Sequence, residues 1–192
     1  MNKRITTRQI VGTGLLLALE IIFQIIGNYL QFGPVNINLS LVTIVLAAVL
    51  FGPLSGATLG FFNGLLVLFS PSTLAIFMPL NPLATVFLCL LKTTLAGLLA
   101  GLAFSFLKKK QTIGLIVASI IVPVVNTGIF TISALIFYQP FLQSGVGDAF
   151  PNIGAFLIFG VIGWNFIFEM ISTVIFSTII GRILLKKEQS VK

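Results

Sequence analysis

Hydrophobic positions run through this sequence in long blocks instead of alternating with polar positions. Only three ionisable side chains lie inside these blocks, namely Glu20, Lys92 and Glu169. The blocks cover residues 10–30, 35–69, 83–107, 113–138 and 153–181. A helix needs about 20 apolar residues to cross the hydrocarbon core of a bilayer. The pattern therefore predicts an all-α integral membrane protein.

The second block decides how many helices the chain contains. It is too long for one helix, and the turn-forming string Phe51-Gly52-Pro53-Leu54-Ser55-Gly56 interrupts it. Interpreted as a hairpin, the block gives two short helices and six helices in total. Interpreted as one bent helix, it gives five.

The basic residues favour six helices. They collect at residues 3–8, 108–110 and 182–192, and cytoplasmic loops carry an excess of Lys and Arg. Six crossings put all three clusters on one side, and the outer loops that they predict, at 31–38, 70–82 and 139–152, hold no Lys or Arg. We therefore expect a single domain over residues 1–192, a compact multi-pass bundle in the cell membrane with both termini cytoplasmic. Its six helices are predicted at roughly 9–31, 35–51, 54–69, 83–107, 113–138 and 153–185.

Composition supports a membrane location and narrows the chemistry. Of the 192 residues 57% are hydrophobic and 8% are charged, with a mean hydropathy of +1.15, whereas soluble domains have about 25% charged residues. A soluble enzyme, a disordered chain and a disulfide-stapled secreted module are excluded. The absence of histidine removes the commonest general base and metal ligand, and the sequence has no phosphate-binding G-x-x-x-x-G-K-[ST] string. We expect no enzyme activity, cofactor or metal, and we assign the net charge of +7 to orientation and anionic lipid, not to nucleic acid.

Polar residues inside the predicted helices gather on single faces. The first helix carries them at Thr13, Glu20, Gln24, Gly27 and Gln31; the last three carry them at Asn81, Thr85 and Lys92, at Ser119, Asn126 and Ser133, and at Asn165, Glu169 and Ser172. An ionisable group inside a membrane is costly and usually serves a function in the protein interior. Four helices present such faces in their outer halves, which predicts one pocket open to the outside. Its predicted ligand-binding residues are Gln24, Asn81, Thr85, Lys92, Asn126, Asn165 and Glu169. Hydrogen bonds between helices are the alternative explanation of each face.

A second face of the first helix is small and smooth. Gly14 and Ala18 lie there, well away from the polar face. A small-x-x-x-small pair suits close approach by another helix, and a lipid-facing position without a partner is the alternative.

Two strings resemble a known transporter family. Leu50-Phe51-Gly52-Pro53-Leu54-Ser55-Gly56 between the second and third helices, and Trp164-Asn165-x-x-x-Glu169 on the last, resemble the substrate-binding S components of energy-coupling-factor (ECF) vitamin transporters. Six short helices, the basic amino terminus and the small pair extend the resemblance over essentially the whole chain. It implies that the protein binds a vitamin at its outer face, docks on a membrane scaffold subunit driven by two ATPase subunits, and topples to release its cargo inside. It also implies that Gly14 and Ala18 belong to the docking surface, where the family commonly has A-x-x-x-A.

The candidate residues favour a small, flexible, anionic ligand with hydroxyls. Lys92 offers a cation to a carboxylate, and the amide side chains suit hydroxyls and an amide. Pantothenate fits this description, and the sequence is most similar to the pantothenate-specific S components; another small water-soluble vitamin or precursor is the alternative substrate. Two other functions stay open, a self-sufficient ion-coupled carrier or channel using Glu20 and Glu169, and a membrane scaffold without cargo.

Overall fold

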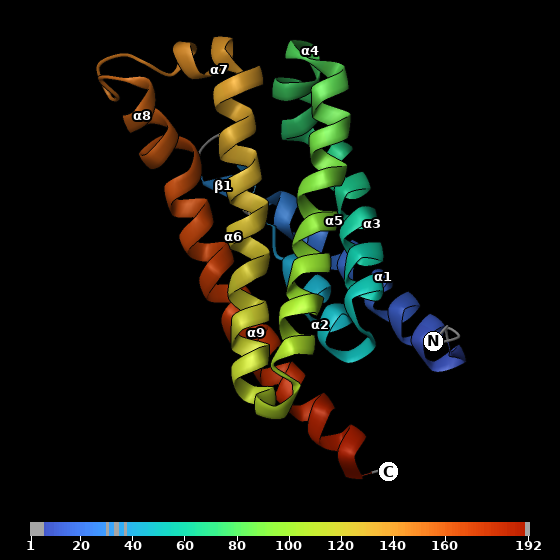
Figure 1. The fold of residues 1–192 in the computed structure, drawn as a ribbon. Coiled ribbons are helices and arrows are strands. Elements are labelled where there is room, and N and C mark those ends of the chain that lie inside the picture. The colour runs from blue at the N-terminus through green and yellow to red at the C-terminus, as the bar shows by residue number, and fades with distance from the viewer. Residues whose placement is uncertain (1–5, 30, 33–34, 37, 191–192) are drawn as a thin grey trace.

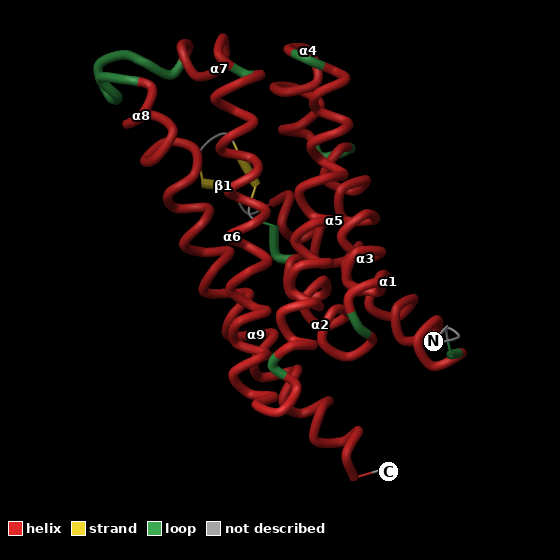
Figure 2. Tube along the Cα trace, in the orientation of Figure 1, coloured by secondary structure: helices red, strands yellow, loops and turns green. Residues whose placement is uncertain are grey.

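The computed structural model of this chain describes residues 6–29, 31–32, 35–36 and 38–190. Helices fill nearly all of this part, and one antiparallel pair of two-residue strands is the only β structure in it (Figure 2). The main helices are α1 (Thr7–Tyr29), α2 (Leu41–Phe51), α3 (Pro53–Leu68), α5 (Pro82–Phe106), α6 (Gln111–Phe137) and α9 (Gly163–Ser190). The short elements are strands β1 (Gln31–Phe32) and β2 (Val35–Asn36), the π-helical turns η1 (Thr73–Phe77) and η3 (Phe156–Ile162), the 3-10 turn η2 (Lys108–Lys110), and helices α4 (Met78–Leu80), α7 (Gln139–Ser144) and α8 (Ile153–Ala155). The expected helical architecture is confirmed.

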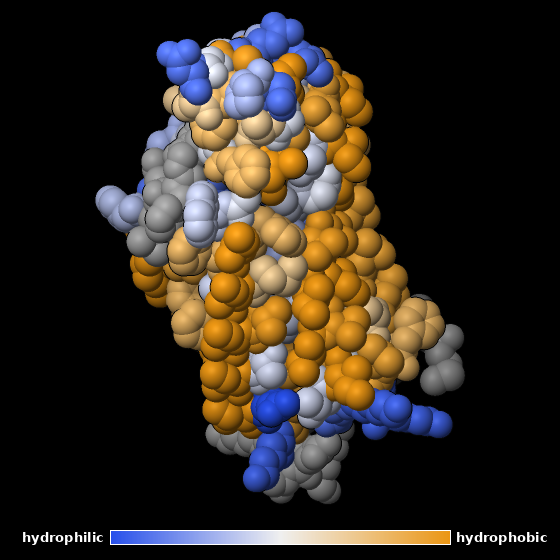
Figure 3. All heavy atoms as spheres, turned by 90° about the vertical axis from the view of Figure 1, so that its left-hand side faces the viewer, coloured by the Kyte–Doolittle hydropathy of each residue, from blue (hydrophilic) through white to orange (hydrophobic). Residues whose placement is uncertain are grey.

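Four helical segments among the described residues are long and apolar enough to cross a membrane. They are Thr7–Tyr29, Pro82–Phe106, Lys108–Phe137 and Ile153–Lys186. A fifth results if α3 and the η1–α4 segment, which meet at a bend of 66°, form one broken span. Helix α2 is apolar but has only 11 residues. The face seen in Figure 3 carries a broad hydrophobic belt between two hydrophilic ends, as a membrane-embedded bundle requires.

Helix α2 lies at the centre of the bundle because it is apolar on every side. The nine residues 41–49 are each at most 5% exposed, as expected for a helix that is hydrophobic all round. The helix packs against α1, α3, α5, α6 and α9. Ile44, Leu59, Ala96 and Leu115 belong to the resulting core.

Helices α3 and α5 pack closely through glycines. Gly56, Gly60 and Gly64 recur every fourth residue on α3, and a Cβ atom added at any of them would overlap the backbone of α5. From the other side, Cβ atoms at Gly97 and Gly101 would overlap the backbone of α3. Small residues at these positions let the two backbones approach.

The turn between α2 and α3 depends on Gly52 and Pro53. Gly52 has a φ of 99°, a conformation that glycine adopts without steric cost. Pro53 follows in the first turn of α3, where its missing N–H leaves no hydrogen bond unmade. These two residues explain why the apolar block 35–69 breaks where the sequence predicts a break.

The two ends of the bundle carry different elements. The start of α1, the turn at Lys108–Lys110 and the end of α9 lie toward the lower end in Figure 1, whereas α4, α7 and α8 lie at the upper end. Helix α1 lies at the periphery and packs against α2 and α3.

The second predicted helix was wrong at its start. It was expected over 35–51, but α2 begins at Leu41, and Val35–Asn36 pairs with Gln31–Phe32 as a strand. Asn and Ser side chains compete with the backbone for hydrogen bonds and favour turns over helix, and Asn36, Asn38 and Ser40 interrupt this stretch. Helices α1, α3, α5 and α6 start and end within two residues of their predicted bounds, whereas the helix predicted over 153–185 is divided into α8, η3 and α9, which together run from Ile153 to Ser190. The loops predicted at 70–82 and 139–152 contain η1, α4 and α7.

Candidate ligand-binding cavity

A cavity of about 90 Å³ lies between α1, α3, η1, α5, α6, η3 and α9. Its apolar walls include Val67, Phe77, Leu88, Phe130 and Phe166. Many polar side chains line it as well, among them Gln24, Asn38, Ser70, Ser72, Thr73, Thr85, Lys92, Asn126, Thr127, Ser133, Asn165 and Glu169. A mostly apolar pocket with a few convergent polar groups is typical of small-molecule binding sites.

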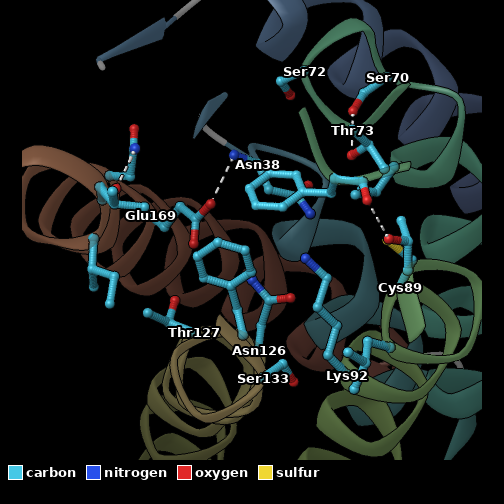
Figure 4. A pocket seen from close by; sticks show the side chains of 18 of the residues that line it. Asn38, Ser70, Ser72, Thr73, Cys89, Lys92, Asn126, Thr127, Ser133 and Glu169 are labelled. Atoms are coloured by element: carbon cyan, nitrogen blue, oxygen red, sulfur yellow. Dashed lines mark hydrogen bonds between the residues drawn. The ribbon is translucent and has the colours of Figure 1, made fainter. Parts of the chain in front are cut away.

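Six of the seven predicted ligand-binding residues line this one cavity. They are Gln24, Thr85, Lys92, Asn126, Asn165 and Glu169. Figure 4 shows that Lys92, Asn126 and Glu169 point toward the same space from α5, α6 and α9. The predicted polar faces of four helices therefore meet at a shared void.

Lys92 is a cation that forms no ion pair within the described part of the chain. Its Nζ lies 5.5 Å from the centroid of the Phe130 ring. The negative ring face attracts such a cation but leaves its hydrogen-bond donors unused. Lys92 can therefore offer donors and a charge to a ligand.

Glu169 is buried in the opposite wall and is held by the backbone of the 31–40 segment. Its Oε1 accepts a hydrogen bond from the N–H of Asn38 at 2.9 Å, and the residue is 5% exposed. Lys92 acts on Glu169 electrostatically without forming an ion pair. The cavity therefore has a positive side on α5 and a negative side on α9.

Two asparagines complete the polar lining. Asn126 is 5% exposed, and its Oδ1 has no hydrogen-bond partner among the described residues. Asn165 donates from Nδ2 to the carbonyl of Val161 at 2.9 Å. Val161 is the second-last residue of the π-helical turn η3. Because a buried acceptor without a partner costs free energy, the Asn126 oxygen is suited to a ligand donor.

Thr85 and Asn81 form hydrogen bonds mainly with other residues of the protein. The Thr85 hydroxyl lies 2.8 Å from the Tyr138 hydroxyl, 2.8 Å from the Asn81 carbonyl and 3.0 Å from the Phe77 carbonyl. Asn81 does not line the cavity, and its Oδ1 accepts from the N–H of Ala84 at 3.1 Å. Asn81 is the N-cap of α5, and its Oδ1 is used in that cap.

Aromatic rings cover the upper end of the cavity. Phe77 makes edge-to-face contacts with Phe130, Tyr138 and Phe141, at centroid distances of 5.6, 5.0 and 5.4 Å. Such pairs stabilise a cluster beyond its buried area. The cluster separates the polar lining from the end that carries α4 and α7.

Gln24 connects the cavity to a polar network that the sequence pattern did not reveal. Its Oε1 lies 3.2 Å from Ser40 Oγ, and Ser40 in turn hydrogen-bonds with Asn38 and Asn63. Asn38 Nδ2 donates to Asn63 Oδ1 at 3.0 Å. The sequence contains little indication of this network. Asn63 is the one amide in α3, and nothing else on that helix marks it. Asn38 acts on the cavity through its backbone N–H, which every residue except proline has.

Glu20 and Ser119, two other residues of the predicted faces, have other surroundings. Glu20 is fully buried beside Thr43 and Asn63 but does not line the cavity. Ser119 pairs with Ser177 at 2.7 Å, which agrees with the interhelical alternative at this position.

The small pair lies on the outer face of α1. Gly14 and Ala18 are both exposed, and a Cβ atom at Gly14 would meet no atom within 4 Å. No described part of this chain covers Gly14.

The chain is similar to known proteins over most of its length. A family model described as the substrate-specific component of ECF transporters matches residues 8–180. The chain is also 30% identical over 151 residues to the pantothenate transporter PanT of Leuconostoc mesenteroides, an alignment that covers 74% of this chain and 72% of the relative. No solved structure matches the chain.

Proposed function

The chain belongs to the substrate-specific components of ECF transporters, and from this premise we propose that it is the vitamin-binding subunit of an ATP-driven uptake transporter in the cell membrane. Its substrate is pantothenate. The 30% identical relative is a pantothenate transporter, and the chemistry of the cavity supports the same ligand.

One observation carries the proposal, which is that Lys92 faces the cavity without an anionic partner among the described residues. Keeping a charge in a low-dielectric interior costs free energy unless it is paired. A ligand carboxylate that enters the cavity offsets this cost through a charge-assisted hydrogen bond. The site is thus complementary to an anion of small size.

The rest of the lining suits the remaining groups of pantothenate. This vitamin has a carboxylate, an amide and two hydroxyls on a flexible aliphatic chain. Glu169 and the Asn126 Oδ1 are acceptors for hydroxyl and amide donors, whereas Asn165 and Gln24 contribute further amides. Thr85 lines the cavity but keeps its protein partners.

Binding is tested by titration calorimetry on the purified full chain. Pantothenate should bind saturably, and a panel of other water-soluble vitamins at the same concentration should not compete. Competition by a different vitamin would change the substrate while keeping the S-component function, and the absence of any saturable ligand would contradict the proposal.

Energy for uptake comes from partner subunits. The sequence has no phosphate-binding string, so the chain works with a membrane scaffold subunit and two ATPase subunits. Vesicles that contain all subunits and internal ATP should accumulate pantothenate, whereas vesicles with this chain alone should not. Uptake by this chain alone under an ion gradient would support the ion-coupled carrier instead.

The exposed pair Gly14 and Ala18 on α1 is proposed as the docking surface for the scaffold subunit. A flat surface lets the helices of two subunits approach closely. Gly14→Leu should abolish uptake and co-purification with the scaffold while pantothenate affinity is unchanged. Loss of affinity would show that this face packs within the chain.

We also propose six crossings with both termini cytoplasmic. The basic turn Lys108–Lys110, the start of α1 and the end of α9 lie toward the same end of the bundle, which supports this topology (Figure 1). Cysteines introduced at Lys109 and Asp148 should react with a membrane-impermeant reagent from the inside and from the outside, respectively. The reverse pattern, or reaction of both from one side, would contradict it.

A further inference from the structure

A buried amide stands behind the cavity without lining it. Asn63 on α3 is fully buried, and it uses both ends of its side chain. Its Oδ1 accepts from Asn38 Nδ2 at 3.0 Å, and its Nδ2 donates to Ser40 Oγ. Burying a polar side chain costs free energy unless it is hydrogen-bonded, as Asn63 is.

Asn63 thereby fixes the residue that holds Glu169. The side chain of Asn38 is bound to Asn63 and Ser40, and its backbone N–H is bound to Glu169 Oε1 at 2.9 Å. Figure 4 shows this bond between Asn38 and Glu169 at the edge of the cavity. Moving the Asn38 backbone would therefore move or release the Glu169 carboxylate.

The same amide reaches a second cavity wall through Ser40. Ser40 Oγ lies 3.2 Å from Gln24 Oε1 on α1, and Gln24 lines the cavity. Glu20, one turn earlier on α1, lies beside Asn63. The peripheral helix α1 and the cavity residue of α9 are thus connected through Ser40 and Asn38, and Asn63 of α3 holds both of these side chains.

We propose that Asn63 is a positioning residue for the cavity, which sets ligand affinity through Asn38 and Glu169 without touching the ligand. The identity of the ligand rests on the proposed function, but the connection between Asn63 and Glu169 does not. Residues that share a hydrogen-bond network have non-additive effects when both are replaced, whereas residues without shared partners have additive ones.

A double-mutant cycle on the full chain tests the proposal, with pantothenate affinity measured by calorimetry. Asn63→Ala should weaken binding about tenfold, which corresponds to about one hydrogen bond. Once Glu169→Ala has been introduced, Asn63→Ala should weaken binding by less than about threefold, because the carboxylate that it positions is gone. In the Lys92→Ala background the full tenfold loss should persist, since among the described residues Lys92 forms no hydrogen bond or ion pair with the network and acts on Glu169 only at longer range.

A matched control separates positioning from general stability. Ser177 is fully buried and hydrogen-bonded between helices, like Asn63, but it does not line or touch the cavity. Ser177→Ala should lower the thermal stability and leave the affinity unchanged. Equal losses of affinity from Asn63→Ala in the wild-type, Glu169→Ala and Lys92→Ala backgrounds would overturn the proposal, because they would indicate a general structural role.

Two provisions keep the test decisive. If Asn63→Ala does not fold, Asn63→Leu removes the same hydrogen bonds with a side chain of similar shape and should have the same effect on affinity. If the wild-type chain does not bind pantothenate, the proposed substrate fails, and the same cycle is measured on thermal unfolding without ligand. Non-additive unfolding free energies for Asn63→Ala and Glu169→Ala then support the connection, and additive ones overturn it.

Discussion

The two halves of this molecule use the same kinds of residue in opposite ways. In the cavity half, formed by the residues that line the cavity, Lys92 and the Asn126 Oδ1 have no hydrogen-bonding or ionic partner among the described residues. In the packed half, formed around α2, Ser119 pairs with Ser177 and Gly56 lies against the backbone of Gly97. At these positions the polar group in the cavity is left for a ligand, whereas the polar group between packed helices is satisfied by the protein itself.

The comparison also explains why the two halves should respond differently to substitution. The packed half has no spare volume, so added atoms must displace backbone. The cavity half has spare volume and unmet hydrogen bonds, so removed atoms change what it binds more than how well it folds. Each prediction below tests one side of this contrast.

The largest effect is expected from Gly56→Leu in the packed half. A Cβ atom there would overlap Ala48 and the carbonyl of Gly97, and overpacking a filled core costs about 3 kcal/mol at the upper end of its usual range. Thermal unfolding of the purified variant should show a large loss of stability or no folded protein. Gly14→Leu is the control, because its added side chain meets open space. Equal losses in both variants would contradict the assignment of a packed half.

Lys92→Ala should have the next largest effect, and it should act on binding. Losing a hydrogen bond to a charged group weakens pantothenate binding by about 1.5–3 kcal/mol, measured by calorimetry. The melting temperature should fall little, since among the described residues Lys92 forms no ion pair and acts on Glu169 only at longer range. Lys186→Ala, which removes an exposed charge at the end of α9, should leave the affinity unchanged. Unchanged affinity in Lys92→Ala would remove this residue from the site.

The helices could be predicted from the sequence because long apolar blocks leave few other structures in a membrane. The short polar segment before α2 could not, since Asn36, Asn38 and Ser40 carry competing signals for helix, turn and strand. Where a block is interrupted by a glycine and a proline, as at Gly52 and Pro53, the break was predictable to the residue.

Cavity residues could be predicted from the sequence where the side chain is too polar to face lipid and must therefore face the interior of the bundle. Lys92 and Glu169 are of this kind, because a charge facing lipid is very costly. Asn81 lies outside the cavity lining, which the sequence could not show, because an amide before a helix serves equally as a cap or as a ligand contact and residue type does not distinguish the two. Asn38 and Asn63 were missed because their roles depend on which segments meet in space, and the sequence pattern along one helix does not contain that information.

A crossed pair of variants compares satisfied and unsatisfied groups within the cavity half. Asn126→Ala should weaken pantothenate binding by about 1 kcal/mol with little change in melting temperature, because its Oδ1 has no partner in the described part of the protein. Thr85→Val should do the reverse, lowering the melting temperature through the lost contacts with Tyr138 and the Phe77 carbonyl. If both variants change the same property, then the presence of a hydrogen-bond partner within the protein does not distinguish residues that bind the ligand from residues that stabilise the fold.

The smallest effect is expected from Ser119→Ala in the packed half. An interhelical hydrogen bond in a membrane protein contributes about 0.6 kcal/mol on average, and Ser119 shares one with Ser177 at 2.7 Å. The unfolding free energy should fall by about that amount, and the double variant Ser119→Ala/Ser177→Ala should be less destabilised than the sum of the two single variants, because they share one bond. Pantothenate affinity should be the same in all three. A loss of affinity would mean that the packed half transmits its strain to the cavity, and the division of the molecule into a binding half and a supporting half would then be false.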